Sequence, residues 1–244
     1  MSATLEQMAM PNATRNGAVL EATGLHKRYG RGESAVEALR GVDVRIGEGE
    51  VVAIMGPSGC GKTTLLHLLG GIERPDSGEV LVGGQPLPQN EGRLAELHRL
   101  AVCFVFQGFG LIPSLPAREN VEFPLTVAGV PAAERHQRAL SALDDVGLLD
   151  WQNHLPEELS GGQRQRIAIA RALVPQPRVI LADEPTGNLD TATGDEILTL
   201  LLDSAKRMKS AIVMVTHDPL AAARADRVLL LRDGVIVENT EPAS

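Results

Sequence analysis

The chain has 244 residues, of which 43% are hydrophobic and 22% are charged. A chain of this length can form one domain with a hydrophobic core, or one domain with a small appended subdomain. Its 31 Asp and Glu residues outnumber its 23 Lys and Arg residues, and this acidic balance argues against a protein that grips nucleic-acid phosphates or binds a membrane through a polybasic surface.

The cysteines and the apolar runs argue against a disulfide-rich protein and against a membrane-spanning one. The two cysteines, Cys60 and Cys103, are too few for a disulfide framework and are typical of buried thiols in a reducing cytosol. The apolar runs are strand-sized and fall short of the ~18 residues that a membrane-spanning helix needs. Residues 1–17 lack the apolar segment of a signal peptide, so we expect a disordered tail there and a folded domain over residues 18–240.

Short β-branched runs alternate with helical patterns along the chain, an order typical of an α/β protein with a parallel sheet. Strands are predicted at residues 19–25, 42–46, 51–55, 78–82, 101–106, 178–182, 211–216, 227–231 and 235–238. Helices are predicted at residues 61–69, 132–146, 161–173 and 191–206. Prolines divide the segment from about 110 to 160 into short helical pieces, which predicts a helical subdomain inserted between strands.

A glycine-rich segment between a buried strand and a helix matches the phosphate-binding pattern G-x-x-x-x-G-K-[ST]. Its residues, with the one that follows, are Gly56, Pro57, Ser58, Gly59, Cys60, Gly61, Lys62, Thr63 and Thr64. The glycines let successive N–H groups point into one cavity, and the helix N-terminus adds positive potential. We expect Lys62 to reach the β- and γ-phosphates of a nucleoside triphosphate and the Thr63 hydroxyl to ligate Mg²⁺.

Polar side chains follow two other buried strands. Asp183 and Glu184 come directly after the apolar run 179–182, where Asp183 can hold Mg²⁺ and Glu184 can polarise the water that attacks the γ-phosphate. His217 ends the next apolar strand. Because ligands bind at the carboxyl edge of an open α/β sheet, we expect His217 to sense the γ-phosphate there.

A second helix start has an unusual composition. Ser160 is a good N-cap residue, and Gly161 and Gly162 follow it before Gln163. Each glycine costs a helix ~1 kcal/mol relative to alanine. The pair is explained if the phosphate of a ligand approaches this backbone closely.

Together these motifs resemble the ATP-binding-cassette (ABC) ATPases over residues 19–238. The elements in family order are Tyr29, the phosphate loop 56–63 (Walker A), Gln107, the signature Ser160–Gln163, the acidic strand 179–184 (Walker B), Asn188–Asp190 and His217. The resemblance implies a P-loop NTPase (RecA-like) core with an antiparallel β edge and an inserted α-helical subdomain, about 110–160, that continues into the signature helix to residue 174. It implies that Tyr29 stacks on adenine, where phenylalanine is expected to serve equally well, and that Gln107 contacts Mg²⁺ or the attacking water.

Finer features resemble the subfamily that powers lipoprotein release, macrolide export and antimicrobial-peptide export, together with its cell-division relative. They are Gly187-Asn188 after Walker B, Phe104–Gln107, Leu111–Pro113 and Glu119–Glu122. Two departures are Cys60, where serine is commonest, and Pro116–Arg118, where Thr-Ala is usual. Neither changes a catalytic side chain.

The resemblance also implies partners. Two chains would form a head-to-tail dimer in which Ser160, Gly161, Gly162, Gln163 and Asp190 contact the ATP held by the other chain. A separate integral membrane permease would be driven from the cytoplasmic side of the inner or plasma membrane, and no nucleic acid is involved. The alternatives are a mechanotransmission ATPase driving a periplasmic partner and, further away, a soluble ABC ATPase or an inactive cassette. Phe109, Leu111, Ile112 and Leu115 are expected to form an exposed apolar cluster that receives a helix of the permease.

Overall fold

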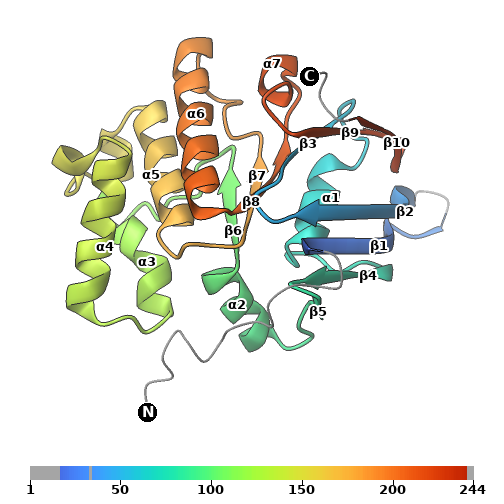
Figure 1. Ribbon diagram of the computed structural model, residues 1–244, viewed down its shortest axis with the longest axis horizontal. Helices are drawn as coiled ribbons and strands as arrows, with labels where there is room; N and C mark the ends of the chain where they lie inside the picture. Colours follow the sequence, from blue (N-terminus) through green and yellow to red (C-terminus); the bar gives the residue numbers. More distant parts are fainter. Residues whose placement is uncertain (1–16, 33–34, 241–244) are drawn as a thin grey trace.

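The computed structural model describes residues 17–32 and 35–240, so most of the tail predicted at residues 1–17 lies outside the described residues (Figure 1). The strands are β1 (Ala18–Tyr29), β2 (Val36–Gly47), β3 (Val51–Met55), β4 (Ser77–Val82), β5 (Gln85–Pro86), β6 (Val102–Phe106), β7 (Val179–Asp183), β8 (Ala211–Val215), β9 (Arg227–Arg232) and β10 (Val235–Thr240). The helices are α1 (Lys62–Leu69), α2 (Glu91–Leu100), α3 (Ala117–Val127), α4 (Ala132–Asp145), α5 (Gly161–Leu173), α6 (Thr191–Met208) and α7 (Pro219–Ala222), with 3₁₀ turns η3 (Leu149–Trp151) and η4 (Pro156–Glu158).

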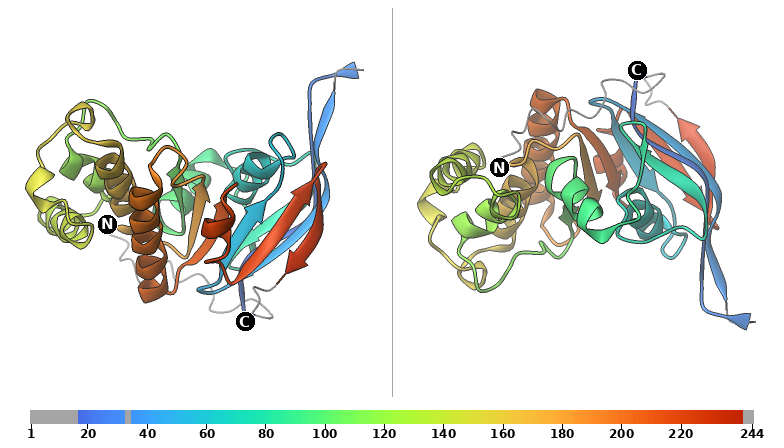
Figure 2. Two further views of the ribbon diagram at one scale, coloured as in Figure 1. Left: turned by 90° about the horizontal axis from the view of Figure 1, so that it is seen from above. Right: turned by 90° about the horizontal axis from the view of Figure 1, so that it is seen from below.

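The strands form two sheets. The larger has the order β10-β9-β3-β8-β7-β6, in which β9, β3, β8, β7 and β6 pair in parallel and β10 is an antiparallel edge. The smaller is antiparallel, with the order β2-β1-β4-β5. Figure 2 shows the β1–β2 hairpin, in blue, projecting at the end of the molecule opposite the helical part. The predicted parallel core with an antiparallel β edge is confirmed.

Helices cover both faces of the parallel sheet. Because side chains alternate along a strand, Leu181 of β7 and Val213 of β8 pack with α1 and the antiparallel sheet, whereas Ile180 and Ile212 pack with α5 and α6. The apolar residues of both strands are buried, as their continuous apolar runs predict for a sheet covered on both faces. The N-terminal helix α1 and the pair α5–α6 therefore lie on opposite faces.

The helical part has a core of its own. Leu125 of α3, Leu143 of α4 and Ile167 of α5 are among its buried residues. Asn120 of α3 is fully buried. Its amide donates to the carbonyl oxygens of Ile112 and Leu115 and accepts from the Ile112 N–H, so one side chain fixes the loop that leads from the sheet into the helices.

The predicted helices and strands are found, together with additional elements and longer strands. Helix α7 and the short strand β5 are absent from the prediction, and β2 begins at Val36 instead of residue 42. Helix α2 is absent from the prediction, although Asn90 caps it by accepting from two backbone N–H groups and such a cap is a recognisable start signal. Strand β1 runs on to Tyr29 instead of ending at residue 25. Register shifts between Ala22 and His26, around Gly24, let the strand bend and continue.

Candidate functional site

The loop between β3 and α1 is held tightly between the two sheets. Gly56 has φ 152°, and a Cβ there would lie 2.1 Å from the carbonyl oxygen of Leu231 in β9. Gly61 has φ 106°, and a Cβ there would lie 2.4 Å from the carbonyl oxygen of Ala38 in β2. Both distances are severe overlaps with backbone atoms, so only glycine permits this loop path.

Lys62 lies across the inside of this loop. Its ammonium donates to the carbonyl oxygens of Gly56 and Pro57, both at 2.8 Å, and the residue is only 9% exposed. Helix α1 begins at Lys62, and its N-cap, Gly61, has no side chain that could occupy the helix terminus. A buried ammonium beside an open helix N-terminus is a site for a polyphosphate.

Thr63 and Asp183 bring two oxygen atoms together at the edge of the parallel sheet. The Thr63 hydroxyl donates to Asp183 Oδ1 at 3.3 Å. Octahedral Mg²⁺ with bonds of about 2.1 Å has neighbouring ligands about 3 Å apart, so the pair fits two adjacent Mg²⁺ positions. Burial raises the pKa of Asp183, and the hydrogen bond from Thr63 opposes this. A bound cation would stabilise the ionised carboxylate.

Glu184 and His217 meet at the same edge. Strands β7 and β8 are paired so that Asp183 lies opposite Val215, and the Glu184 N–H donates to the Val215 carbonyl at 3.0 Å. Glu184 Oε1 lies 3.2 Å from His217 Nδ1. Glu184 has φ 44°, a conformation that is uncommon away from glycine and is often found at functional sites.

Gln107 follows β6 at this edge but is engaged with the segment after β7. Its Nε2 donates to Asn188 Oδ1 at 3.4 Å, and Asn188 Nδ2 donates back to the Gln107 carbonyl at 2.9 Å. A Cβ at Gly187 would lie 2.8 Å from Gln107 Nε2. Gly187 and Asn188 thus hold Gln107 beside the acidic end of β7.

The predicted signature Ser160–Gln163 forms the start of α5. The Ser160 hydroxyl accepts from the Gln163 N–H, and Gln163 Oε1 accepts from the Ser160 N–H, which is a capping box. A Cβ at Gly162 would lie 2.7 Å from Thr193 Cγ2 of α6. Close packing within the chain is therefore a reason for this glycine, beside the phosphate approach expected from the sequence. Asp190 is exposed and caps α6 through the Thr193 N–H.

Tyr29 is the last residue of β1 and is 40% exposed. Its hydroxyl donates to Glu73 Oε2 at 2.5 Å and lies 3.5 Å from the Thr64 hydroxyl of α1. The tyrosine is thereby placed beside the helix that follows the phosphate loop. Glu73 is absent from the sequence prediction, because 44 positions separate it from Tyr29 and no local pattern links the two.

The loop after β6 is more enclosed than the sequence suggests. Phe109, Leu111, Ile112 and Leu115 are all half-buried, so the expected exposed apolar cluster is wrong in its exposure. Leu111 packs against the core of the helical part, and the Arg164 guanidinium lies 4.8 Å from the centre of the Phe109 ring. The exposed apolar side chains of α3 are instead Phe123 and Val127, which are 43% and 45% exposed.

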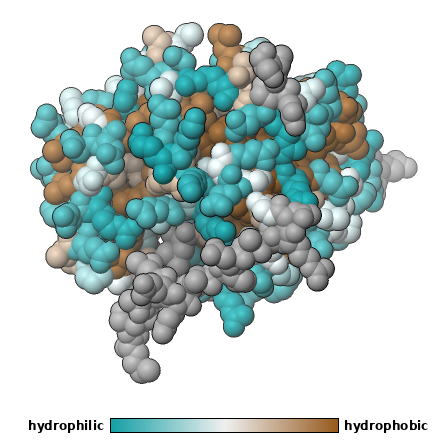
Figure 3. Space-filling model, viewed as in Figure 1, coloured by the Kyte–Doolittle hydropathy of each residue, from teal (hydrophilic) through white to brown (hydrophobic). Residues whose placement is uncertain are grey.

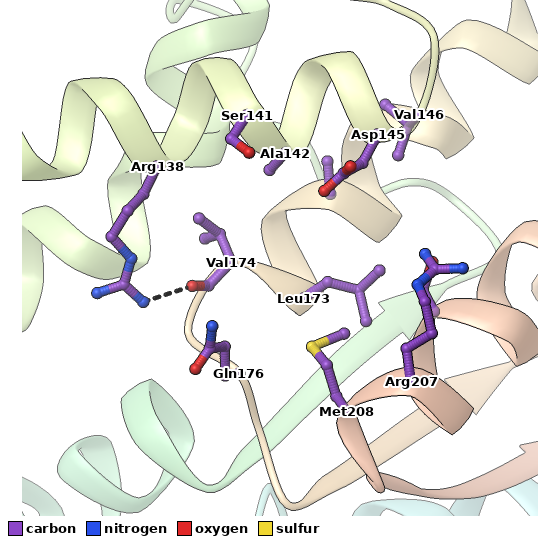
Figure 4. A pocket seen from close by; sticks show the side chains of 12 residues that line it. Arg138, Ser141, Ala142, Asp145, Val146, Leu173, Val174, Gln176, Arg207 and Met208 are labelled. Carbon is purple, nitrogen blue, oxygen red and sulfur yellow. Dashed lines mark hydrogen bonds between the residues drawn. The ribbon is translucent and has the colours of Figure 1, made fainter.

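A groove of about 270 Å³ lies elsewhere, between α4 and the C-terminal ends of α5 and α6 (Figure 4). Arg138 and Arg207 line it, and Arg138 donates to the Val174 carbonyl across it. Gln176 and Met208, which also line it, shortly precede β7 and β8. The groove is therefore at the amino edge of the sheet, away from the phosphate loop.

Comparison with known proteins decides the family. The profile described as "ABC transporter" matches residues 39–187. The lipoprotein-releasing system ATP-binding protein LolD of Legionella pneumophila (strain Lens) is 47% identical over 220 residues, covering 90% of this chain and 97% of that protein. The chain belongs to the ABC transporter family. It is an ATP-hydrolysing cassette of that family, with the P-loop core and inserted helices that its motifs predict.

This ABC cassette is also similar to a longer export protein and to a solved cassette structure. The pyoverdine export ATP-binding/permease protein PvdT of Pseudomonas syringae pv. tomato is 49% identical over 224 residues, which is 91% of this chain but 34% of that protein. The chain thus spans about a third of that relative's length. Among solved structures, a dimeric post-hydrolysis state of the cassette MJ0796 bound to ADP and Pi has a TM-score of 0.85 at 40% identity, covering 92% of this chain and 99% of the other.

Figure 3 shows that hydrophilic side chains predominate on the face seen there, with hydrophobic ones in scattered patches between them. Within residues 17–32 and 35–240, none of the helices has the length and apolar character needed to cross a bilayer.

Proposed function

We propose that this cassette hydrolyses Mg-ATP at a composite site of a head-to-tail dimer and thereby drives a separate membrane permease. The observation that carries the proposal is the gathering of three contacts at one sheet edge. These are Lys62 across the phosphate loop, Thr63 against Asp183, and Glu184 against His217. Together they supply charge neutralisation, a cation site and a base for water, which phosphoryl transfer to water requires.

The role of each side chain follows from its chemistry. Lys62 neutralises the β- and γ-phosphates, and Thr63 and Asp183 hold Mg²⁺, which supplies charge neutralisation when bound. Glu184 accepts the proton of the attacking water, and His217 orients Glu184 and the γ-phosphate. Gln107 joins this group when the loop after β6 moves with the permease.

The dimer is proposed because one chain holds the two phosphate-binding helix starts apart. Helices α1 and α5 pack on opposite faces of the parallel sheet. Ser160, Gly161, Gly162, Gln163 and Asp190 would therefore contact ATP bound by the second chain, in an isologous pair that uses the same surface twice. The dimeric structure of the related cassette MJ0796 supports this arrangement.

The partner is proposed to be an integral permease, with the cassette peripheral on the cytoplasmic side of the inner or plasma membrane. The related proteins are named for pyoverdine export and for lipoprotein release. Because these names refer to export and to release, we assign this cassette to an export or extrusion system.

The test is the substitution Glu184→Gln, measured with and without the permease. It should leave Mg-ATP binding intact, lower turnover by at least ~100-fold as loss of a general base does, and trap an ATP-bound dimer in size-exclusion chromatography. Glu48→Gln, an exposed carboxylate between β2 and β3, is the matched control and should turn over like the parent. Hydrolysis by Glu184→Gln at the parent rate in the permease complex would overturn the assignment.

A further inference from the structure

Glu73 lies just after α1 and is held by groups from three directions. Its Oε2 accepts the Tyr29 hydroxyl at 2.5 Å and lies 3.7 Å from the Lys27 ammonium. Its Oε1 lies 3.4 Å from His67 Nδ1, on the last turn of α1. A carboxylate with partners on both oxygens is a fixed acceptor, so the phenol that it binds is fixed as well.

Apart from its hydroxyl contacts, Tyr29 has the Lys27 ammonium 5.4 Å from the centre of its ring. It ends β1 in the antiparallel sheet, at the turn end of the β1–β2 hairpin, where it pairs with Val36, and it is 40% exposed. An exposed ring on a strand end changes rotamer readily, and ordering it on binding has an entropic cost that lowers the affinity. Besides Glu73, which follows α1, the Tyr29 hydroxyl is near Thr64 within α1. Both polar contacts therefore join the ring to α1 or to the residue segment just after it, and α1 begins in the phosphate loop.

We propose that Glu73 is a positioning residue for nucleotide binding. It holds the Tyr29 ring at a fixed place relative to α1. The ring that would stack on the base and the loop that would bind the phosphates are then preorganised relative to each other. The inference rests on the proposed stacking of Tyr29 on adenine. It also changes the expectation for phenylalanine at position 29, because phenylalanine keeps the ring but loses the O–H that Glu73 accepts.

Calorimetric titration of the chain tests this with two ligands, ATP and inorganic tripolyphosphate, in Mg²⁺-free buffer so that ATP stays intact. Glu73→Ala should raise the Kd for ATP about three- to tenfold, the size of one hydrogen bond, and leave the Kd for tripolyphosphate unchanged. Glu73→Gln keeps an acceptor oxygen and should bind ATP like the parent. Glu79→Ala removes an exposed carboxylate of β4 and is the control for loss of negative charge.

A double-substitution cycle completes the test. Tyr29→Phe should weaken ATP binding as much as Glu73→Ala does, and the two together should be no worse than either alone. An unchanged Kd for ATP in Glu73→Ala, or an equal loss in the Tyr29→Phe background, would overturn the role of Glu73. Tyr29→Ala separates the two ideas: if it leaves ATP binding unchanged, the proposed stacking itself is wrong.

Discussion

Tyr29 is the only tyrosine in the chain, so the ionisation of its phenol can be followed without interference from another residue. Partial burial and the hydrogen bond to Glu73 both raise the pKa of Tyr29. The folded state therefore favours the neutral phenol. The contribution of the Tyr29 phenol to the free energy of unfolding is complete below the ordinary tyrosine pKa. It is lost as the pH rises through the raised pKa of the folded state.

A spectroscopic pH titration measures this shift. The phenolate absorbance of the folded chain should have its midpoint above the ordinary tyrosine value, and Glu73→Ala should lower that midpoint because it removes the acceptor and the nearby negative charge. A midpoint at or below the ordinary value in the parent chain would show that the phenol is not held by Glu73.

At the scale of elements, α5 and α6 are packed so closely that Gly162 has no room for a side chain. A Cβ there meets Thr193 Cγ2 at 2.7 Å. We predict that Gly162→Ala destabilises the fold by about 1–2 kcal/mol, because overpacking strain exceeds the ~1 kcal/mol that alanine gains in helix propensity. Urea unfolding measures the change.

Thr193→Ser supplies the matched background, because it removes the methyl group that the new Cβ would meet. In that background Gly162→Ala should become neutral or stabilising, since only the helix-propensity term remains. An equal loss of stability in both backgrounds would show that the glycine is required for another reason.

The exposed residues of α3 are a better candidate for the permease contact than the loop before it. Leu111 packs on the helical core, so Leu111→Asp should lower stability as well as assembly. Phe123 is exposed, and Phe123→Asp should leave the melting temperature and ATP binding unchanged while reducing co-purification with the permease. Normal assembly and normal permease-stimulated turnover in Phe123→Asp would place the contact elsewhere.

At the scale of the whole molecule, the dimer predicts complementation between two inactive chains. Lys62→Ala damages the phosphate loop, and Gly161→Glu places a carboxylate at the start of α5, where it would repel phosphate. Each variant alone should be inactive in the permease complex. A mixed dimer contains one composite site that is free of both substitutions, so an equal mixture should recover up to about a quarter of the parent rate.

The readout is ATP turnover across a series of mixing ratios, with a maximum at equal amounts of the two variants. A chain that carries both substitutions, mixed with Lys62→Ala, is the control and should stay inactive, because none of its dimers contains an intact site. Complementation would be absent if each chain used its own α5 to contact its own ATP.

The sequence alone is sufficient to predict which side chains gather at the carboxyl edge of the parallel sheet. Asp183 ends a buried strand, and the phosphate loop, Glu184 and His217 lie just after buried strands. Parallel strands bring their carboxyl ends to one edge. Local order along the chain is sufficient to predict that juxtaposition, and the pairing of β7 with β8 realises it.

Only the tertiary structure decided how those groups are held. The contact of Tyr29 with Glu73, the packing of Gly162 on Thr193, and the enclosure of Leu111 all join positions from different elements. Such contacts depend on how helices and sheets pack against one another. The periodicity within a single segment does not predict that packing. Motif spacing therefore predicts which residues act, whereas packing between elements determines which neighbours position them.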